Sequence, residues 1–476
     1  MDKYKKLASN TIIFAIGTFS SKILSFLLMP FVTRMMTTGS YGAADLIQQT
    51  GNVIIPIAFL CVNSAALRFS MDKAERKSDV FTVGVRVTLV GFLAFLLFAY
   101  PISLIKINDF KLGDYLVLIY VFVLTSGFRQ LCQQFVRGSG HVKLFAIDGI
   151  LATVTYLLFT MLFLGVFKWG VTGYILAIVA SDFCSVLFFT VTAKLYRYVR
   201  LKGVRRQTGR DMLRYCLPMI PASISFWIIN ASDMFFVQGM CEGYAGRSGN
   251  HWVGLLSAGD FLPQIITILG SIFYEAWQLS AVTEETDREA FFSKIFRVYA
   301  SVLFCCVAGI IMLCQLLMRV FKAEYFDAWT FVPFLTLCSM LTCLNQFLNS
   351  VYVVYKRSTG SLFTMLAGAV LNLILNYCFI RLWGPWGVTL ASFLSLMLVF
   401  LLRAYSTRGL LEIDFHPAWL VLNLALVLAE IWCMMKLTHW ALPVVGITAV
   451  ICVMNIREVL SMLDTLIGKF LKKKKA

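Results

Sequence analysis

Fourteen apolar runs, each about as long as a membrane is thick, follow one another along this chain of 476 residues. A helix needs about 20 consecutive apolar residues to cross the hydrocarbon core of a bilayer. The runs cover residues 10–33, 42–68, 80–105, 114–136, 143–167, 170–193, 212–240, 251–279, 291–321, 327–355, 361–383, 386–405, 417–438 and 440–463. The sequence therefore predicts an all-α integral membrane protein with about 14 transmembrane helices.

The composition supports the same class. Hydrophobic residues make up 59% of the chain and charged residues 14%, and a soluble fold has no core large enough to bury so much apolar surface. A net charge of +17 also occurs in nucleic-acid-binding proteins, but here Lys and Arg lie in short segments between the runs and in Lys472–Lys475. That placement orients a chain in a bilayer. We expect membrane lipids as partners, and no nucleic acid.

The distribution of Lys and Arg indicates how the chain is oriented. If alternate connecting segments face the cytoplasm, they and the adjoining run ends hold 32 of the 42 Lys and Arg residues, the outward segments hold nine, and Lys22 lies within the first run. Positive residues are enriched on the cytoplasmic side of membrane proteins. This predicts a multi-pass protein with both termini in the cytoplasm. The first run exceeds signal-peptide length and lacks a small-residue cleavage pattern, so we expect it to be a membrane span.

An internal repeat divides the chain. The sequence Trp-Gly-Val-Thr occurs at Trp169–Thr172 and again at Trp386–Thr389, 217 residues later. The basic segment 194–214, with eight Lys or Arg residues against Asp211 alone, lies between the two copies. Because six spans return a chain to the same side, we expect two pseudo-symmetric six-helix bundles in parallel orientation, followed by two C-terminal helices. The predicted domains are an N-terminal six-helix lobe at 1–193, a basic cytoplasmic linker at 194–214, a C-terminal six-helix lobe at 215–405, and two additional transmembrane helices with a basic cytoplasmic tail at 406–476.

Two of the apolar runs carry a stripe of polar residues. One face of the second run bears Asp45, Gln48, Gln49, Asn52 and Asn63, and one face of the eighth run bears Asp260, Gln264, Thr267, Ser271 and Gln278. Both stripes begin with Asp-x-x-x-Gln at helical spacing. Polar groups without partners in hydrocarbon cost several kcal/mol each, so the stripes must face a neighbouring helix or water. Polar residues commonly hold membrane helices together, but two symmetric stripes headed by an acid favour a hydrated cavity.

Further ionisable residues lie inside the predicted spans or at their ends. Lys22 is a lone cation near the middle of the first run, and we expect it to face the cavity. Asp148 and Asp182 fit at least as well as partners of buried cations, and Arg68 and Glu275 fit also as interface residues. The candidate substrate-binding residues are Lys22, Arg34, Asp45, Gln48, Gln49, Asn52, Arg68, Arg129, Asn230, Asp233, Asp260, Gln264 and Glu275.

The order and spacing of several short motifs resemble those of one family. The motifs are Asn10–Gly17, Ser20–Arg34, Tyr41–Gly42 and Ala65–Phe69 in the first half, and Leu217–Pro221 with Asp233 and Val253–Asp260 in the second half. With them the sequence resembles the polysaccharide and O-antigen flippase family, the polysaccharide transporter branch of the multidrug, oligosaccharidyl-lipid and polysaccharide exporter superfamily. The similarity extends over most of the chain and is least distinctive in the last two spans.

The resemblance implies a flippase for polysaccharide biosynthesis and export in the bacterial cytoplasmic membrane. Such a protein carries an undecaprenyl-pyrophosphate-linked oligosaccharide from the cytoplasmic to the outer leaflet by alternating access. Pyrophosphate binds cations strongly, and the candidate cations are Lys22, Arg34, Arg68 and Arg129. The two polar stripes would meet the glycan, and the polyprenyl tail would stay in lipid between the lobes. Other polysaccharide assembly proteins are further expected partners.

Other functions remain open. A lipid II flippase is the nearest alternative, and a drug or cation antiporter of the same superfamily would share the two-lobed bundle. A polytopic glycan polymerase or ligase would be an enzyme, usually with a sizeable external loop that bears catalytic residues. Here the predicted external loops are short, and the sequence has no Gly-x-Ser-x-Gly, His-Glu-x-x-His or Asp-x-Asp motif. We therefore expect a protein that is not an enzyme and has no cofactor, while any coupling ion stays unidentified.

Overall fold

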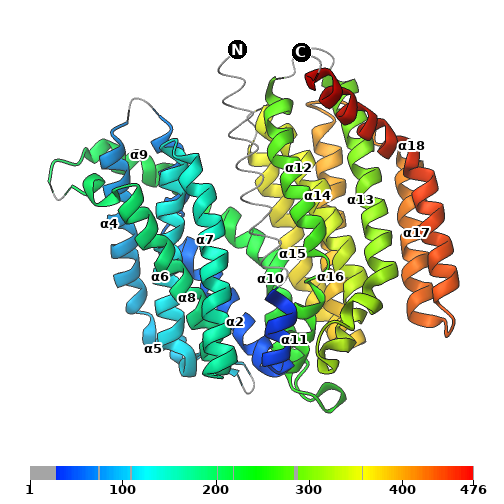
Figure 1. Cartoon of the computed structure of the whole chain (residues 1–476), viewed down its shortest axis with the longest axis horizontal. Coiled ribbons are helices and arrows are strands. Elements are labelled where there is room, and N and C mark those ends of the chain that lie inside the picture. Colours follow the sequence, from blue (N-terminus) through cyan, green and yellow to red (C-terminus); the bar gives the residue numbers. More distant parts are fainter. Residues whose placement is uncertain are drawn as a thin grey trace. The chain divides into compact units, whose positions relative to one another are not determined.

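The computed structural model describes residues 28–72, 75–107, 110–200, 202–217, 219–283, 288–355 and 358–474. These residues are almost entirely helical, because hydrocarbon offers the backbone no hydrogen-bond partner and a helix satisfies its own amides and carbonyls. The chain forms two compact units, Met1–Gly254 and Leu255–Ala476. Figure 1 labels most of the helices.

The first unit is built mainly from nine helices within the described residues. They are α2 (Thr38–Ala58), α3 (Val62–Ser70), α4 (Lys77–Leu96), α5 (Ala99–Ser103), α6 (Leu116–Gly138), α7 (Val142–Thr160), α8 (Gly170–Thr192), α9 (Arg206–Cys216) and α10 (Met219–Met240), and α11 (Gly249–Gly259) begins in this unit. The connections include a hairpin of β1 (Lys106–Ile107) and β2 (Phe110–Lys111) and the short turns η1 (Leu112–Tyr115), η2 (Met161–Val166), η3 (Leu195–Tyr198) and η4 (Tyr244–Gly246).

The second unit continues from the end of α11. Its helices are α12 (Gln264–Thr283), α13 (Arg288–Met318), α14 (Val332–Val354), α15 (Ser358–Trp383), α16 (Gly387–Thr407), α17 (Pro417–Lys436) and α18 (Ala441–Lys474), with the short turns η5 (Ala323–Thr330) and η6 (Gly384–Trp386). Within this unit α13 packs along α18, and α14 and α15 both pack along α16.

The helices follow the predicted apolar runs. Within the described residues, ten helical segments are long and apolar enough to cross a membrane, or up to twelve if each of two bent pairs is one span. One of the ten, Thr359–Thr407, holds both α15 and α16. Most of the first run, 10–33, lies outside the described residues. The all-helical membrane fold is therefore confirmed, whereas the count of fourteen and the two six-helix bundles stay predictions.

Two of the predicted spans are broken. The second span bends by 58° between α2 and α3, and the eighth bends by 46° between α11 and α12. Pro56 lies just before the first break and Pro263 lies in the second, and proline both lacks an amide proton and clashes with the preceding helical turn. The expectation that each polar stripe follows one continuous helix is therefore wrong. Asn63 lies on α3, and Asp260 lies in the turn before α12.

In the first unit α10 packs against α2. The indole Nε1 of Trp227 on α10 donates to the backbone oxygen of Gln49 on α2 at 3.1 Å. The unit extends to Gly254, beyond the basic segment 194–214 at which we expected the two lobes to divide. The compact unit thus includes the predicted seventh span, while the division of the sequence repeat at 194–214 stays a prediction.

Glycines let the first turns of α2 and α11 touch. A Cβ atom added to Gly42 would lie 2.1 Å from the backbone oxygen of Asn250, and one added to Gly254 would lie 2.0 Å from the backbone oxygen of Thr38. Thr38 Oγ1 and His251 Nδ1, 2.6 Å apart, join the same two turns. The two backbones can approach this closely only because neither glycine has a side chain.

Aromatic and polar contacts hold the second unit together. Trp277 on α12 stacks on Phe347 of α14 with ring centroids 4.8 Å apart, and its Nε1 donates to Ser350 Oγ at 2.8 Å. Thr448 Oγ1 on α18 donates to a carboxylate oxygen of the buried Glu430 on α17 at 2.7 Å. The predicted C-terminal pair of helices is thus joined by a buried hydrogen bond.

The contact between α2 and α11 predicts how an added methyl group changes stability. In Gly254→Ala the methyl would meet the backbone oxygen of Thr38, which cannot swing aside as a side chain can. We expect the unfolding free energy to fall by about 1–3 kcal/mol, the usual cost of overpacking. The measurement is the Tm of the purified protein in detergent.

Gly39→Ala is the matched control, because Gly39 lies on α2 and nothing lies within 4 Å of its added Cβ. We expect its Tm to be unchanged or slightly raised, since alanine is favoured over glycine in a helix by about 0.5–1 kcal/mol. Equal losses of Tm in both variants would contradict the close contact.

Candidate functional site

The structure places most of the candidate residues. Lys22 and the side chains of Asn230 and Glu275 lie outside the described residues. Arg34 is exposed just before α2, and Arg68 is exposed in the last turn of α3. The other candidates lie on α2, α6 and α10 in the first unit and at the start of α12 in the second: Asp45, Gln48, Gln49, Asn52, Arg129, Asp233, Asp260 and Gln264.

The polar stripe on α2 is a short ladder of side-chain hydrogen bonds. Gln49 Nε2 donates to Asp45 Oδ1 at 3.4 Å, and Asn52 Nδ2 donates to Gln49 Oε1 at 3.4 Å. Asp45 is buried, Gln48 and Gln49 are half-buried, and Asn52 is exposed. Each amide group has two donors and an acceptor. The ladder therefore keeps hydrogen-bonding capacity for a polar ligand along one face of the helix.

The remaining polar residues near this stripe have different surroundings. Asn63 Nδ2 on α3 donates to Gln130 Oε1 on α6 at 3.0 Å, so Asn63 joins two helices, as polar residues in membranes often do. Asp233 is buried on α10, the helix whose Trp227 contacts α2. The stripe that can meet a ligand in this unit is thus the part on α2.

The second unit contains a matching pair. Gln264 Nε2 donates to Asp260 Oδ2 at 3.2 Å, and Thr267 Oγ1 donates to the backbone oxygen of Gln264 at 2.8 Å. Gln264 is exposed and Asp260 is half-buried. Asp45 and Gln49 make the same contact over the same four-residue spacing in the first unit. Both units therefore place an acid and an amide together at the spacing predicted from the sequence.

Arg129 lies at the junction of α6, α7 and α8. Its Nη1 donates to Asp182 Oδ1 on α8 at 2.7 Å, and its Nη2 lies 3.6 Å from Asp148 Oδ2 on α7. Ser126 Oγ on α6 donates to the other carboxylate oxygen of Asp182. Asp148 is fully buried, whereas the Arg129 side chain is 25% exposed. Two carboxylates thus share one guanidinium within the predicted membrane spans.

These ion pairs give Arg129 a structural role beside the predicted one, which stays a prediction. The sequence makes Arg129 a candidate cation for pyrophosphate, whereas the structure shows a partly exposed cation paired with two buried acids. A charge in hydrocarbon is costly unless it is paired, and here two acids already surround the cation. The role that this geometry supports is holding α6, α7 and α8 together.

Arg403 on α16 is a buried arginine that charge placement alone does not single out. It is 4% exposed and donates to the backbone oxygen of Asn345 on α14 at 2.7 Å and to Thr364 Oγ1 on α15 at 3.2 Å. The repeat offset of 217 puts Asn345 and Thr364 within one residue of the counterparts of Arg129 and Asp148. Applied to the Arg129 junction, that offset would have pointed to this second polar junction.

The polar clusters do not have the composition of a metal site. Among the residues that the structure describes, no group of three or more His, Cys, Asp or Glu side chains is arranged to hold a metal ion. The clusters instead consist of carboxylates, amides and hydroxyls, which bind sugars and other polar ligands through hydrogen bonds.

Comparisons with known proteins concern both the sequence and the fold. A sequence profile described as polysaccharide biosynthesis protein matches residues 7–277. No protein of curated function matches the sequence. The chain is similar in structure to the lipid II flippase MurJ in an inward closed conformation, with a TM-score of 0.72, 14% sequence identity, and coverage of 96% of this chain and 100% of that chain.

Multidrug exporters are similar too. An outward-facing MATE family transporter of the MOP superfamily has a TM-score of 0.60 and 16% identity, with 84% of this chain and 94% of that chain covered. An inward-facing MATE family transporter has a TM-score of 0.62 and 15% identity, with 83% of this chain and 98% of that chain covered. At such identities the likeness shows a shared fold.

The charge count at the Arg129 junction predicts unequal effects of two variants. Arg129→Met leaves Asp182 buried without its cation, and breaking a buried ion pair in this way costs about 3 kcal/mol or more. Asp148→Asn leaves one cation with one acid, so we expect its Tm to be unchanged or raised. Thermal unfolding of the purified protein measures both, and a larger loss in Asp148→Asn than in Arg129→Met would contradict this account.

Proposed function

The chain belongs to the polysaccharide biosynthesis protein family, and from this we propose that it is a flippase for an undecaprenyl-pyrophosphate-linked oligosaccharide. It would carry this lipid from the cytoplasmic to the outer leaflet of the bacterial cytoplasmic membrane by alternating access. The observation that carries the proposal is the hydrogen-bonded Asp–Gln pair that recurs in the two units, at Asp45–Gln49 and Asp260–Gln264.

The polar stripes suit a glycan. Sugar hydroxyls both donate and accept hydrogen bonds, and the stripe on α2 offers the Asp45 carboxylate as an acceptor and the amides of Gln49 and Asn52 as both donors and acceptors. Placing such groups within membrane-spanning elements is costly unless they have partners. A polar headgroup that passes along the stripe would supply partners that hydrocarbon cannot.

The charged part of the substrate needs cations. Arg129 is paired with Asp148 and Asp182. We therefore expect the other predicted cations, Lys22, Arg34 and Arg68, to bind the pyrophosphate. Arginine and lysine both bind phosphate oxygens strongly, arginine through a planar fork and lysine as a point charge. Because Arg34 precedes α2 and Arg68 lies in the last turn of α3, these two would meet the pyrophosphate at opposite ends of the span, at different stages of its passage.

A lipid II flippase is the second candidate. The observation that favours it is the likeness over 96% of this chain to the lipid II flippase MurJ. The family description favours a polysaccharide precursor. Transport of drugs or cations is less well supported, because the MATE transporters cover a smaller share of the chain at lower TM-scores. In each case the protein would act as a transporter with both termini in the cytoplasm, and as a polysaccharide flippase it would have other polysaccharide assembly proteins as partners.

Loss of the protein should trap its substrate. We expect deletion of the gene to make a lipid-linked oligosaccharide accumulate, measured by lipid extraction and mass spectrometry, and to reduce surface polysaccharide, measured by labelling of intact cells. Asp260→Ala and Lys22→Ala should each abolish surface polysaccharide while the protein stays in the membrane, because each removes a group from the headgroup site. Asp327→Ala, in the exposed turn η5, is the control and should export normally.

The same experiment separates the candidates. Accumulation of lipid II in place of an oligosaccharide precursor would select the second function. Normal surface polysaccharide in both Asp260→Ala and Lys22→Ala would remove these residues from the site.

A further inference from the structure

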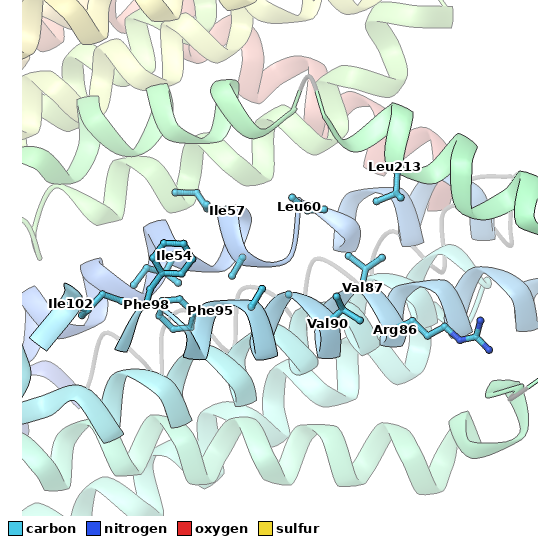
Figure 2. A pocket seen from close by; sticks show the side chains of 13 residues that line it. Ile54, Ile57, Leu60, Arg86, Val87, Val90, Phe95, Phe98, Ile102 and Leu213 are labelled. Carbon is cyan, nitrogen blue, oxygen red and sulfur yellow. The ribbon is translucent and has the colours of Figure 1, made fainter. Parts of the chain in front are cut away.

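An apolar groove runs along the first unit beside the break in the second span. Its volume is about 670 Å³, and Figure 2 shows it between α2, α4, α5 and α9. Thirteen residues line it, and Arg86 is the charged one. Ile102 lies at one end of the row of labelled side chains and Arg86 at the other, with Leu213 of α9 facing the row from the opposite side.

The broken span makes room for this groove. After Pro56 the chain leaves the helix, and Leu60 and Cys61 take the left-handed conformation with φ of 51° and 53°. At the same level Gly91 brings α4 against α2, since a Cβ on Gly91 would lie 2.0 Å from the backbone oxygen of Ala58. Ala58 and Gly91 at this contact and Leu60 in the break all line the groove. The groove therefore lies at the break, which hydropathy does not show.

The exposed side chains of the groove indicate an oily occupant. Val90 is 66% exposed, Phe98 57% and Ile57 45%, although all three line the groove. Exposed apolar side chains on a membrane span meet hydrocarbon. A concave apolar surface of this kind takes a hydrocarbon chain better than a polar or charged ligand.

The Arg86 end of the groove is basic. Arg86 Nη2 donates to the backbone oxygen of Arg200 at 3.2 Å, and the Arg200 amide donates to Thr82 Oγ1 on α4 at 2.9 Å. Two hydrogen bonds thus join this end of the groove to the basic segment 194–214, which has eight Lys or Arg residues and one acid. Such a cluster stabilises an anion nearby. The groove therefore suits a molecule with an anionic head and a long apolar tail.

The length of the groove separates two kinds of lipid. Arg86 and Ile102 are sixteen residues apart, which is about 24 Å along α4 and α5 at 1.5 Å per residue. One leaflet of hydrocarbon is about 15 Å thick, half of the membrane core. The acyl chains of a bulk phospholipid stay in their own leaflet, so they would fill only part of the groove. A tail longer than one leaflet would fill all of it.

We propose that this groove holds the polyprenyl tail of the lipid-linked substrate, with the tail-side phosphate of the pyrophosphate at Arg86, in addition to the cations named for the headgroup. The inference rests on the proposed function, because it takes the occupant to be the same lipid that is transported. It goes further by naming a tail site inside the first unit, whereas the sequence suggested only that the tail stays in lipid between the lobes. The tail would then be bound by this unit while the headgroup is loaded from the cytoplasmic side.

Photo-crosslinking tests the occupant directly. We place p-benzoylphenylalanine at Val90, in the groove, and in a separate variant at Leu93, which is 61% exposed on the same helix and does not line the groove. The purified full-length protein is put in phosphatidylethanolamine–phosphatidylglycerol nanodiscs with alkyne-tagged undecaprenyl phosphate. We expect at least tenfold more labelling at Val90 than at Leu93, and competition by untagged undecaprenyl phosphate but not by added phosphatidylglycerol.

Two substitutions test the tail contact and the phosphate contact separately. In the Val90 crosslinking variant, Ala94→Trp should fill the groove and lower labelling at least tenfold, and Arg86→Gln should lower it severalfold by removing the cation. Leu93→Trp, in the same variant, controls for added bulk on α4 and should leave labelling unchanged. Each variant is first checked for an unchanged Tm, and Arg86→Gln, which adds no bulk, keeps the test informative if Ala94→Trp does not fold.

The outcomes separate this inference from the proposed function. Equal labelling at Val90 and Leu93, or competition by phosphatidylglycerol, would overturn the tail site even if deletion of the gene traps an oligosaccharide lipid. Competed labelling at Val90 without any trapped lipid would leave the tail site standing and overturn the flippase function. The binding measurement needs no transport, so the two results are independent.

Discussion

Hydrocarbon supplies no hydrogen-bond partner, and the rest of the structure depends on that constraint. Continuous helices such as α6 and α8 satisfy their own backbone groups. Where a span is broken, the chain supplies the missing acceptor itself: the Cys61 amide donates to the Pro56 oxygen at 3.0 Å, and the Gln264 amide donates to the Asp260 oxygen at 3.2 Å. A break is therefore tolerated only where such local bonds form. Both breaks also adjoin a polar stripe, so the irregular backbone and the polar side chains occur together.

The same constraint governs the buried charges. Arg129 is shared by two acids, whereas Arg403 donates to a neutral carbonyl and a neutral hydroxyl. These junctions lie at matching positions of the repeat, since Asn345 and Thr364 are each within one residue of a counterpart in the first unit. Three helices meet at a polar contact in both junctions. The arginine is paired with carboxylates at the Arg129 junction and with neutral groups at the Arg403 junction. The repeated feature is thus the polar three-helix contact, and its charge differs between the units.

Much of the fold was predictable from the sequence because each apolar run has the length of a membrane-spanning helix. The Asp-x-x-x-Gln pairs were predictable as well, since residues four apart on a helix are neighbours wherever the helix lies. The sequence also suggested Asp148 and Asp182 as partners of cations, but not that both meet Arg129, because the three residues come from three helices and their meeting depends on packing. The broken spans were missed because Pro56 and Pro263 are compatible with continuous membrane helices when neighbouring groups compensate. The acids and the prolines are visible in the sequence, but the acids alone do not show which cation they meet, and the prolines alone do not show whether a helix breaks.

The helix α2 joins the two halves of the proposed substrate site. Asp45 and Gln49 lie on one face of it, whereas Ile54 and Ala58, which line the groove, lie on the opposite face by the 3.6-residue period. An amphiphile needs both environments at once, because its sugar would lose hydrogen bonds in oil and its tail would be exposed in water. A single helix that is polar on one side and apolar on the other can keep the two parts apart while both stay bound. The helix α2 ends at the break after Pro56. At this break a bound molecule can pass from one face of α2 to the other, with its head on the polar face and its tail on the apolar face.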